Sequence, residues 1–249
     1  MWGKDDKVLG VLGGMGPLAT QLFYRMLIDM TDADRDQDHL DMIILNHASI
    51  IDRTEAIMSG RSEILYDALL KNVKKLEENG VYAIAIPCNT SHALIDRLKQ
   101  EVDIPIIDMI RETAKYIKTN RPDVKKVGIL ATDGTVSAGL YQKACDEEGL
   151  ETFVPSKEGQ ALIMSIIYHS IKGGNPVDYN DFIKIQGELA AAGCHGAIMG
   201  CTELSCVKEI LGLPSYYVDA LEVLAFKSIS ICGKRIKKNF LENKGNEPV

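Results

Sequence analysis

The sequence contains no long hydrophobic run. Its most apolar N-terminal stretch, "KVLGVLGG", is short and interrupted by glycine. A signal-peptide core or a membrane span needs a longer unbroken segment. We therefore expect neither a signal peptide nor a contact with membranes, and we expect the protein to be cytoplasmic.

Positive charge is also in deficit. The chain has 28 lysine and arginine residues against 35 aspartate and glutamate residues, which gives a formal net charge of −7. A protein that binds nucleic acid phosphates without regard to sequence needs a basic face. This composition argues against nucleic acid as a partner.

A third absence is that of C-x-x-C pairs. Six cysteines are present without the spacing of a zinc ligand set: Cys88, Cys145, Cys194, Cys201, Cys206 and Cys232. In a reducing cytoplasm they do not form a disulfide framework. We expect no metal site, and we expect packing roles for all of them except Cys88 and Cys201.

The chain does have the composition of a globular protein. Of its 249 residues, 46% are apolar and 25% are charged, close to the average for soluble domains, and the length suits two lobes. Short apolar runs such as "VYAIAIPC" and "GAIMGC" alternate with amphipathic segments. Such runs are buried on both faces of parallel sheets, so the predicted fold class is α/β.

The order of elements in the first half appears again in the second. We expect strands at "KVLGVLGG", "DMIILNH", "VYAIAIPC" and "IPIIDMI", with helices over about 17–32, 62–79 and 91–102. The second half restarts at "KKVGILATDGT", with strands at "ETFVPS" and "GAIMGC" and helices over 137–149, 161–171 and 178–192. Matching residues are Gly10 and Gly128, Cys88 and Cys201, and Asp108 and Asp219, at separations of 118, 113 and 111 residues.

This internal repeat predicts two similar open, mostly parallel lobes about a pseudo-twofold axis. Functional loops of such lobes lie at the carboxyl ends of their strands, so the two cysteine loops would meet in one cleft. We place an N-terminal lobe at 1–118, to which the C-terminal helix could return, and a C-terminal lobe at 119–232. Residues 233–249 are expected to form a polar, frayed tail.

Cys88 lies where an apolar strand gives way to a helix. Pro87 cannot donate to a strand ladder and marks the end of the strand. Asn89, Thr90 and Ser91 then offer capping side chains and free backbone amides. The dipole at a helix N-terminus favours negative charge, so it lowers the pKa of a thiol from its reference of about 8.5 and can hold a carboxylate.

Cys201, followed by Thr202 and Glu203, repeats this arrangement. A lone cysteine of this kind is more often a small buried residue. A symmetry-related pair, however, suits the removal of a proton from one face of a carbon and the delivery of another to the opposite face. The sequence therefore predicts two-base racemisation, with one thiolate and one thiol. His92, four residues after Cys88, could tune that thiol or face solvent.

The glycine-rich turn "LGGMGPLAT" leaves two interpretations open. Residues 14–19 match the G-x-G-x-x-A pattern of dinucleotide-binding turns. The second strand, however, ends in Asn46 and His47 rather than in the acid that would hold a ribose. A turn whose backbone amides approach a small anion is preferred, with Pro17 in the first helical turn.

Several polar side chains are candidates for contact with a substrate. Arg53 is expected in a loop after the second strand, where its planar guanidinium could clamp a carboxylate. Lys172 precedes two glycines at a helix end, where the dipole favours a cation in any case. Each could instead be a solvated surface residue. Glu203 either complements a helix dipole or accepts a hydrogen bond in the cleft, and Thr132 offers a hydroxyl donor.

These motifs resemble the aspartate/glutamate racemase superfamily, and within it the cofactor-independent amino-acid racemases of the aspartate type. The segments "GVLGGMGPLAT", "PCNTSH" and "GCTEL" carry the resemblance, "DRT" and "IKGG" support it, and it spans about residues 8–230. It implies two α/β lobes with the active site between them, a homodimer, and no cofactor.

The resemblance also implies roles for individual residues. Cys88 and Cys201 would be the opposed acid and base. Together with Thr202 and Glu203, which follow Cys201, the substrate-binding candidates are Met15, Arg53, Asn89, Thr90, Ser91, Thr132 and Lys172. Of these, Asn89, Thr90 and Ser91 would hold the α-carboxylate.

The expected reaction is the interconversion of L- and D-amino acids, with aspartate or glutamate as the substrate. Two alternatives come from the same superfamily, a hydantoin racemase and a malonate-type decarboxylase. A third alternative is a small-molecule binding protein that uses the cleft without chemistry.

Overall fold

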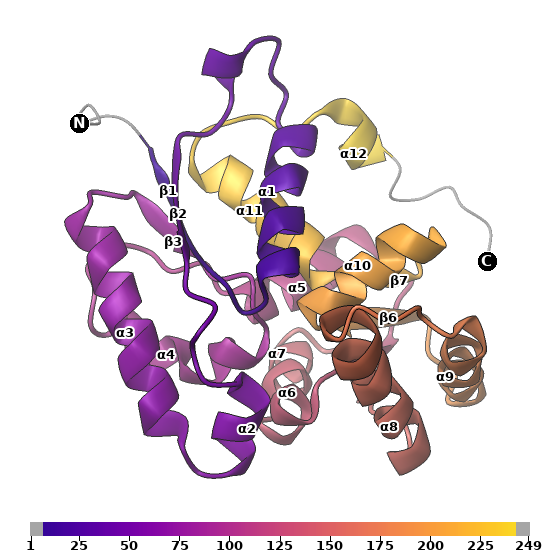
Figure 1. Ribbon diagram of the computed structural model, residues 1–249. Helices are drawn as coiled ribbons and strands as arrows, with labels where there is room; N and C mark the ends of the chain where they lie inside the picture. The colour runs from indigo at the N-terminus through magenta and orange to yellow at the C-terminus, as the bar shows by residue number, and fades with distance from the viewer. Residues whose placement is uncertain (1–6, 243–249) are drawn as a thin grey trace.

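Each half of the chain forms its own parallel sheet (Figure 1). The computed structural model describes residues 7–242. The strands are β1 (Leu9–Gly13), β2 (Met42–Asn46), β3 (Ala83–Ala85), β4 (Lys126–Ala131), β5 (Glu151–Phe153), β6 (Gly196–Gly200) and β7 (Tyr217–Asp219). The strand orders are β2-β1-β3 and β5-β4-β6-β7. The predicted α/β class with two mostly parallel sheets is confirmed.

The helices flank and connect these sheets. Those of the first half are α1 (Pro17–Met30), α2 (Arg53–Met58), α3 (Ser62–Glu78), α4 (Ile95–Lys99) and α5 (Met109–Asn120). Those of the second half are α6 (Asp133–Ser137), α7 (Leu140–Glu147), α8 (Lys157–Ser165), α9 (Tyr179–Ala191), α10 (Thr202–Leu211), α11 (Ala220–Ile231) and α12 (Lys238–Glu242). The part of the chain between residues 7 and 242 also contains two 3-10 helices, η1 (Asp36–Asp38) and η2 (Thr90–Leu94), and one π-helix, η3 (Ile166–Lys172).

The fourth strand differs between the halves. In the second half it is β7, whereas "IPIIDMI" contributes only a single bridge, between Ile106 and Ile84. The chain turns away two residues later because Asp108 caps α5, its Oδ1 accepting a hydrogen bond from the backbone N–H of Arg111 at 3.1 Å. The strand expected there is therefore wrong, and α5, which sequence analysis did not place, begins in its last residues.

Strand β2 was expected to be buried on both faces, and it is not. It is an edge strand that pairs only with β1. Ile44 is 38% exposed, and its neighbours in the strand are partly exposed too. An apolar run is as compatible with an edge as with a centre, because the sequence does not reveal what covers the strand.

The helix expected over 91–102 is broken into η2 and α4. Side chains of the first turn compete with the helical backbone for its acceptors. His92 Nδ1 bonds the carbonyl of Cys88 at 2.8 Å, while the N–H of His92 bonds the carbonyl of Asn89 at 2.9 Å in the 3-10 pattern. His92 is buried and its Nε2 accepts from the N–H of Met109, so it does not face solvent and both of its ring nitrogens bond backbone groups.

Two other expected helices are also divided. The segment 137–149 splits into α6 and α7 because Gly139 adopts a left-handed conformation, with φ of 64°, between them. The segment 161–171 begins earlier than expected, as α8, and continues as the π-helix η3. Short π-helical stretches occur frequently at functional sites.

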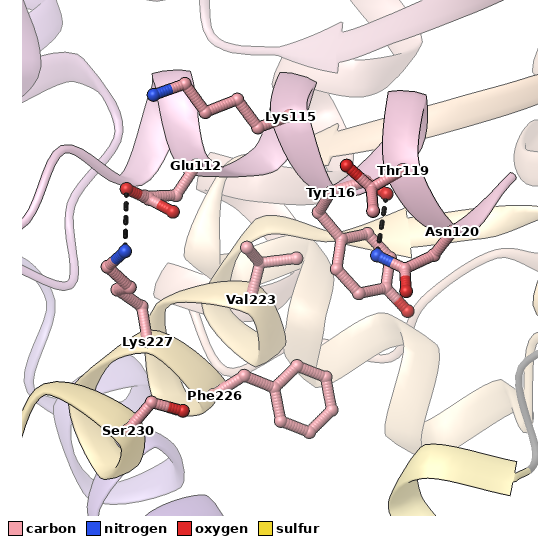
Figure 2. Close-up of a pocket in the computed structure, with 9 residues that line it drawn as sticks. All are labelled: Glu112, Lys115, Tyr116, Thr119, Asn120, Val223, Phe226, Lys227 and Ser230. Atoms are coloured by element: carbon pink, nitrogen blue, oxygen red, sulfur yellow. Dashed lines mark hydrogen bonds and ion pairs between the residues drawn. The ribbon is translucent and has the colours of Figure 1, made fainter. Parts of the chain in front are cut away.

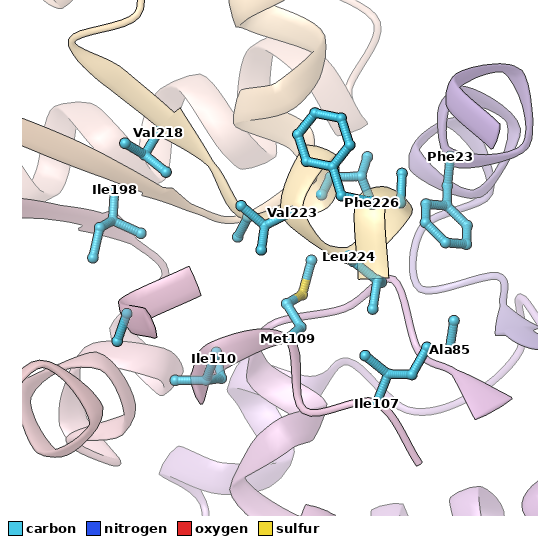
Figure 3. Close-up of a cluster of buried hydrophobic side chains, with 14 of the residues drawn as sticks. Phe23, Ala85, Ile107, Met109, Ile110, Ile198, Val218, Val223, Leu224 and Phe226 are labelled. Carbon is cyan, nitrogen blue, oxygen red and sulfur yellow. The ribbon is translucent and has the colours of Figure 1, made fainter. Parts of the chain in front are cut away.

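A shared hydrophobic core joins the lobes. Helix α11 packs against α1 and α5, and α5 packs against α7. Figure 3 shows the cluster, to which Phe23 comes from α1, Met109 from α5 and Leu224 from α11, all fully buried. Each such side chain contributes about 1.5–3 kcal/mol on burial. Helix α1 of the first half thus packs on α11 of the second, and the boundary expected at residue 118 falls in the last turn of α5.

The expected polar tail is attached to the first lobe as far as it is described. The backbone N–H of Asp32 donates to the carbonyl of Arg235, and that of Lys237 donates to the carbonyl of Met30. Ile236 forms an antiparallel bridge with Thr31, and α12 follows. The expectation of a frayed end is therefore wrong for this part, and residues 243–249 lie outside the described residues.

A hollow of about 250 Å³ lies between α5 and α11 on the outer surface (Figure 2). The ion pair between Lys227 Nζ and Glu112 Oε1, at 3.2 Å, spans it. None of the predicted site residues lines it.

None of the helices between residues 7 and 242 is long and apolar enough to cross a membrane.

Candidate active site

Cys88 and Cys201 line one cleft between the lobes. Cys88 follows β3 and Cys201 follows β6, the matching strands of the two sheets. Both are nearly buried, with exposed fractions of 4% and 6%. The repeat therefore brings two strand-end thiols from opposite lobes to the same cleft.

Hydrogen-bond donors surround the sulfur of Cys88. The hydroxyl of Ser91 donates to Cys88 Sγ at 3.1 Å and also lies 3.4 Å from Met15 Sδ. Burial alone would lower the pKa of the Arg53 guanidinium, but the neighbouring Cys88 sulfur and the carboxylates of Asp52 and Glu203 outweigh burial and raise this pKa. The Ser91 hydroxyl and the buried Arg53 guanidinium are therefore the polar groups that act on this sulfur.

Cys201 lies in the opposite environment. Its thiol donates to Glu203 Oε2 at 3.0 Å. Burial raises the pKa of Cys201 well above its usual value, and the Glu203 carboxylate raises it further against the opposing effect of Lys172. The lowered pKa expected from the N-terminus of α10 is therefore wrong for this cysteine, because desolvation and a carboxylate outweigh the helix dipole. Cys201 is set up as the protonated member of the pair.

Arg53 is not in a loop but is the first residue of α2. Asp52 caps this helix, with its Oδ1 accepting from the N–H of Glu55 at 3.0 Å. The Arg53 side chain turns back, so that its Nη1 lies 3.5 Å from the carbonyl of Ile50 and 3.4 Å from that of Ile51. With 8% of its surface exposed, Arg53 is not a solvated arginine.

Lys172 reaches the cleft from the end of η3. Its Nζ lies 3.5 Å from Asp52 Oδ2, an ion pair between the lobes, and 4.1 Å from the centre of the Tyr168 ring. Burial alone would lower the pKa of Lys172, but Glu203, Tyr168, Cys201 and Asp52 outweigh it and raise this pKa. The lysine therefore stays charged and is held in place before any ligand arrives.

Hydroxyl groups join the lobes on the other side of the cleft. Thr90 Oγ1 lies 3.0 Å from Thr132 Oγ1 and 2.9 Å from Thr135 Oγ1, and all three side chains are buried. The lobes also approach closely here, because a Cβ added to Gly134 would lie 2.9 Å from the Cα of Thr54. Thr132 and Thr90 are thus partners of each other across the cleft.

The glycine-rich turn closes the remaining side. Gly14, with φ of 93°, adopts a conformation that L side chains rarely adopt, and a Cβ there would lie 2.5 Å from the carbonyl carbon of His47. A Cβ added to Gly16 would lie 3.3 Å from Glu203 Oε1. The turn therefore packs directly over the Cys201 side of the cleft.

The predicted site residues lie together around this cleft. The lining side chains are Met15, Asp52, Arg53, Thr54, Cys88, Asn89, Thr90, Thr132, Tyr168, Lys172, Cys201, Thr202 and Glu203. Ser91 lies just behind, on the Cys88 sulfur. Only about 10 Å³ remains free, roughly the space of one water molecule. A molecule larger than water can enter only when the lobes or their side chains move apart.

A comparison with protein families matches this chain to the model described as Asp/Glu/Hydantoin racemase over residues 12–225. The chain belongs to the Asp/Glu/hydantoin racemase family. The family resemblance noted from the motifs is thereby confirmed, and with it the expectation of an isomerase of the racemase class.

Two relatives match this family member over nearly their whole length. The broad specificity amino-acid racemase RacX of Bacillus subtilis is 27% identical over 228 residues, which cover 90% of this chain and 97% of the relative. The structure of Picrophilus torridus aspartate racemase superposes with a TM-score of 0.80 at 29% identity, covering 96% of this chain and 99% of the other.

More distant structures share the architecture. An aspartate racemase homologue from Pyrococcus horikoshii has a TM-score of 0.72 at 27% identity, over 91% of this chain and 99% of the other. A glutamate racemase from Bacillus anthracis has a TM-score of 0.63 at 18% identity, over 90% and 81%, a likeness of fold alone.

Sequence analysis missed three residues that line the cleft, namely Asp52, Thr54 and Tyr168. Tyr168 donates to both carboxylate oxygens of Asp52, at 3.0 and 3.1 Å. A signal was present for each, because Asp52 and Thr54 flank Arg53 in "DRT", and Tyr168 precedes Lys172 by four residues, on the same helix face.

Among residues 7–242 no group of His, Cys, Asp and Glu side chains is arranged to hold a metal ion.

The unequal surroundings of the two thiols predict unequal reactivity. At pH 7.5 iodoacetamide should label Cys88 at least about tenfold faster than Cys201, since the thiolate is the nucleophile and the raised pKa keeps Cys201 protonated. Both are similarly buried, so access does not explain a difference. Peptide mapping of the labelled protein measures the two rates.

The pH dependence supplies the control. Labelling of Cys201 should rise as the pH increases towards its raised pKa, because the thiolate fraction grows. Preferential labelling of Cys201 at pH 7.5 would contradict the assignment.

Proposed function

We propose that this protein interconverts L- and D-amino acids by two-base proton transfer at Cα, without pyridoxal phosphate. The observation that carries the proposal is the pair of strand-end thiols in one cleft, with donors around Cys88 and a carboxylate on Cys201. The thiolate of Cys88 removes the Cα proton, and the thiol of Cys201 delivers its proton to the opposite face. The reverse direction exchanges the two roles.

The planar carbanion formed between these steps needs stabilisation by fixed dipoles. Its negative charge spreads onto the carboxylate of the substrate. Hydrogen bonds from surrounding donors to the carboxylate oxygens therefore become stronger as the proton leaves. The side chains of Asn89 and Thr90 on one lobe and Thr132 and Thr202 on the other supply such donors, and all four are buried. Arg53 and Lys172 supply positive charge.

Aspartate and glutamate are the first substrates to test, because two cations face the cleft. The structural relative named aspartate racemase supports this choice. The cations are, however, matched by two carboxylates, those of Asp52 and Glu203. This balance, together with the relative named a broad specificity racemase, favours a wider range of amino acids as the second candidate.

Exchange of the Cα proton tests reaction and substrate together. Each L- and D-amino acid of a panel of acidic, neutral and basic members is incubated with the protein in deuterated water. We expect deuterium at Cα, measured by proton NMR, together with the appearance of the opposite enantiomer. The absence of exchange with every member would falsify the proposal.

The alternatives have distinct readouts. A hydantoin racemase would exchange hydantoins and not free amino acids, and a malonate-type decarboxylase would release carbon dioxide from a malonate. A binding protein would protect Cys88 from alkylation without exchanging any proton. The two cleft cations favour a carboxylate substrate over a hydantoin.

We further propose that the protein is a cytoplasmic homodimer. The resemblance to aspartate-type racemases supports the dimer, and six free cysteines suit a reducing compartment. Light scattering during size-exclusion chromatography measures the mass in solution, where a monomer would contradict the dimer.

A further inference from the structure

Asn89 occupies the N-cap position of η2, yet its side chain does not cap that helix. Its Oδ1 accepts a hydrogen bond, 2.5 Å long, from the hydroxyl of Tyr141 on the opposite lobe. Its Nδ2 is buried and has no hydrogen-bond partner within the described part of the chain. Asn89 lines the cleft. A buried donor without a partner costs free energy. This unpaired amide N–H group therefore indicates that a bound ligand supplies an acceptor.

Tyr141 is held rigidly at the start of α7. Its ring is fully buried. It fills the space that Gly200 leaves, because a Cβ added there would lie 2.7 Å from Tyr141 Cε2. Burial raises the pKa of Tyr141 well above its usual value, so the hydroxyl keeps its proton and remains a donor. Gly200, next to Cys201, thus links the position of this ring to the active-site strand.

We infer that Tyr141 is a positioning residue that fixes the amide of Asn89 so that its Nδ2 donates to the carboxylate of the substrate. The inference rests on the proposed racemase function and adds to it a residue outside the cleft. The Tyr141 hydroxyl donates to Oδ1, and this hydrogen bond holds the amide with its Nδ2 turned away from Tyr141. In the opposite orientation Oδ1 would face the carboxylate and repel it.

The orientation matters most when the proton leaves Cα. Negative charge on the carboxylate oxygens then increases, so a fixed N–H donor binds the transition state more strongly than the substrate. Loss of the tyrosine hydroxyl should therefore affect kcat more than KM. A tyrosine that only packed in the core would affect stability instead.

The test is Tyr141→Phe, assayed by racemisation and by Cα exchange in deuterated water. We expect kcat to fall about tenfold or more, with a smaller change in KM. Tyr217→Phe is the matched control, because Tyr217 is a buried tyrosine of the same lobe whose hydroxyl has no hydrogen-bond partner in the described residues. Its kcat should stay within about twofold of the wild type.

A double-mutant cycle shows whether Tyr141 acts through Asn89. In the Asn89→Ala background, Tyr141→Phe should cause no further loss, since the two residues form one unit. An equal loss in both backgrounds, or a folded Tyr141→Phe variant with the kcat of the wild type, would overturn the inference. A wild-type protein that exchanges no amino acid would instead contradict the proposed function.

A second variant keeps the test valid if Tyr141→Phe does not fold. Asn89→Asp keeps an acceptor for Tyr141 and replaces the Nδ2 donor by an oxygen of similar size. Its kcat should fall below that of Asn89→Ala, because a second carboxylate would face the substrate. Activity equal to or above that of Asn89→Ala would count against the orientation.

Discussion

Replacement of Cys88 or Cys201 by serine should lower kcat for racemisation by about 10³-fold or more. A serine hydroxyl has nearly the size of the thiol but is not ionised at neutral pH, so one proton acceptor is lost in each variant. Because the two residues act as a unit, the double variant should be little worse than either single one. The measurement is the rate of appearance of the opposite enantiomer, starting from each enantiomer in turn.

Cys194→Ser is the control for this pair. Cys194 precedes β6, is only partly buried and does not line the cleft. Its variant should keep its activity within about twofold of the wild type. Full racemase activity in either Cys88→Ser or Cys201→Ser would remove the two-base mechanism, although not the family assignment.

Replacement of Arg53 by glutamine should have the next largest effect. The guanidinium interacts electrostatically with the Cys88 sulfur and with the carboxylates of Asp52 and Glu203. Because Arg53 is buried, little water can replace it there. Removal of one member of a buried charged group costs about 3–5 kcal/mol in stability. We expect kcat/KM to fall about 10²-fold or more, since a loss of about 2.7 kcal/mol of charge stabilisation in the transition state corresponds to that factor.

The same variant should slow the alkylation of Cys88, because the cation that stabilises its thiolate is gone. Arg61→Gln provides the matched control, since Arg61 pairs with Glu55 at the surface with 46% of its side chain exposed. Surface pairs contribute about 0–1 kcal/mol, so activity and Cys88 labelling should not change. An Arg53→Gln variant with normal labelling and normal kcat/KM would show that the guanidinium does not act on Cys88.

Local patterns in the sequence were sufficient for the strands that carry the cysteines. The run before Cys88 and the run before Cys201 are apolar throughout and end where Pro87 or a polar cap follows, so strand, end and loop could all be predicted. The separation of 113 residues between the cysteines then predicted a repeat, and the first three strands of each half have matching orders. The same reasoning failed for β2 and for η2. The exposure of β2 depends on which elements cover it, and the helix type of η2 depends on side chains that compete for backbone acceptors.

The sequence by itself determined that Cys88 and Cys201 meet, because parallel strands of a repeated unit end at the same edge of their sheets. It did not determine the surroundings of each thiol. Only the tertiary structure placed Arg53 beside one sulfur and aligned Glu203 with the other, and it brought Tyr141 from the second lobe to Asn89 of the first. The physical reason is that a pKa and the orientation of an amide depend on the groups within a few ångströms, which lie far apart along the chain.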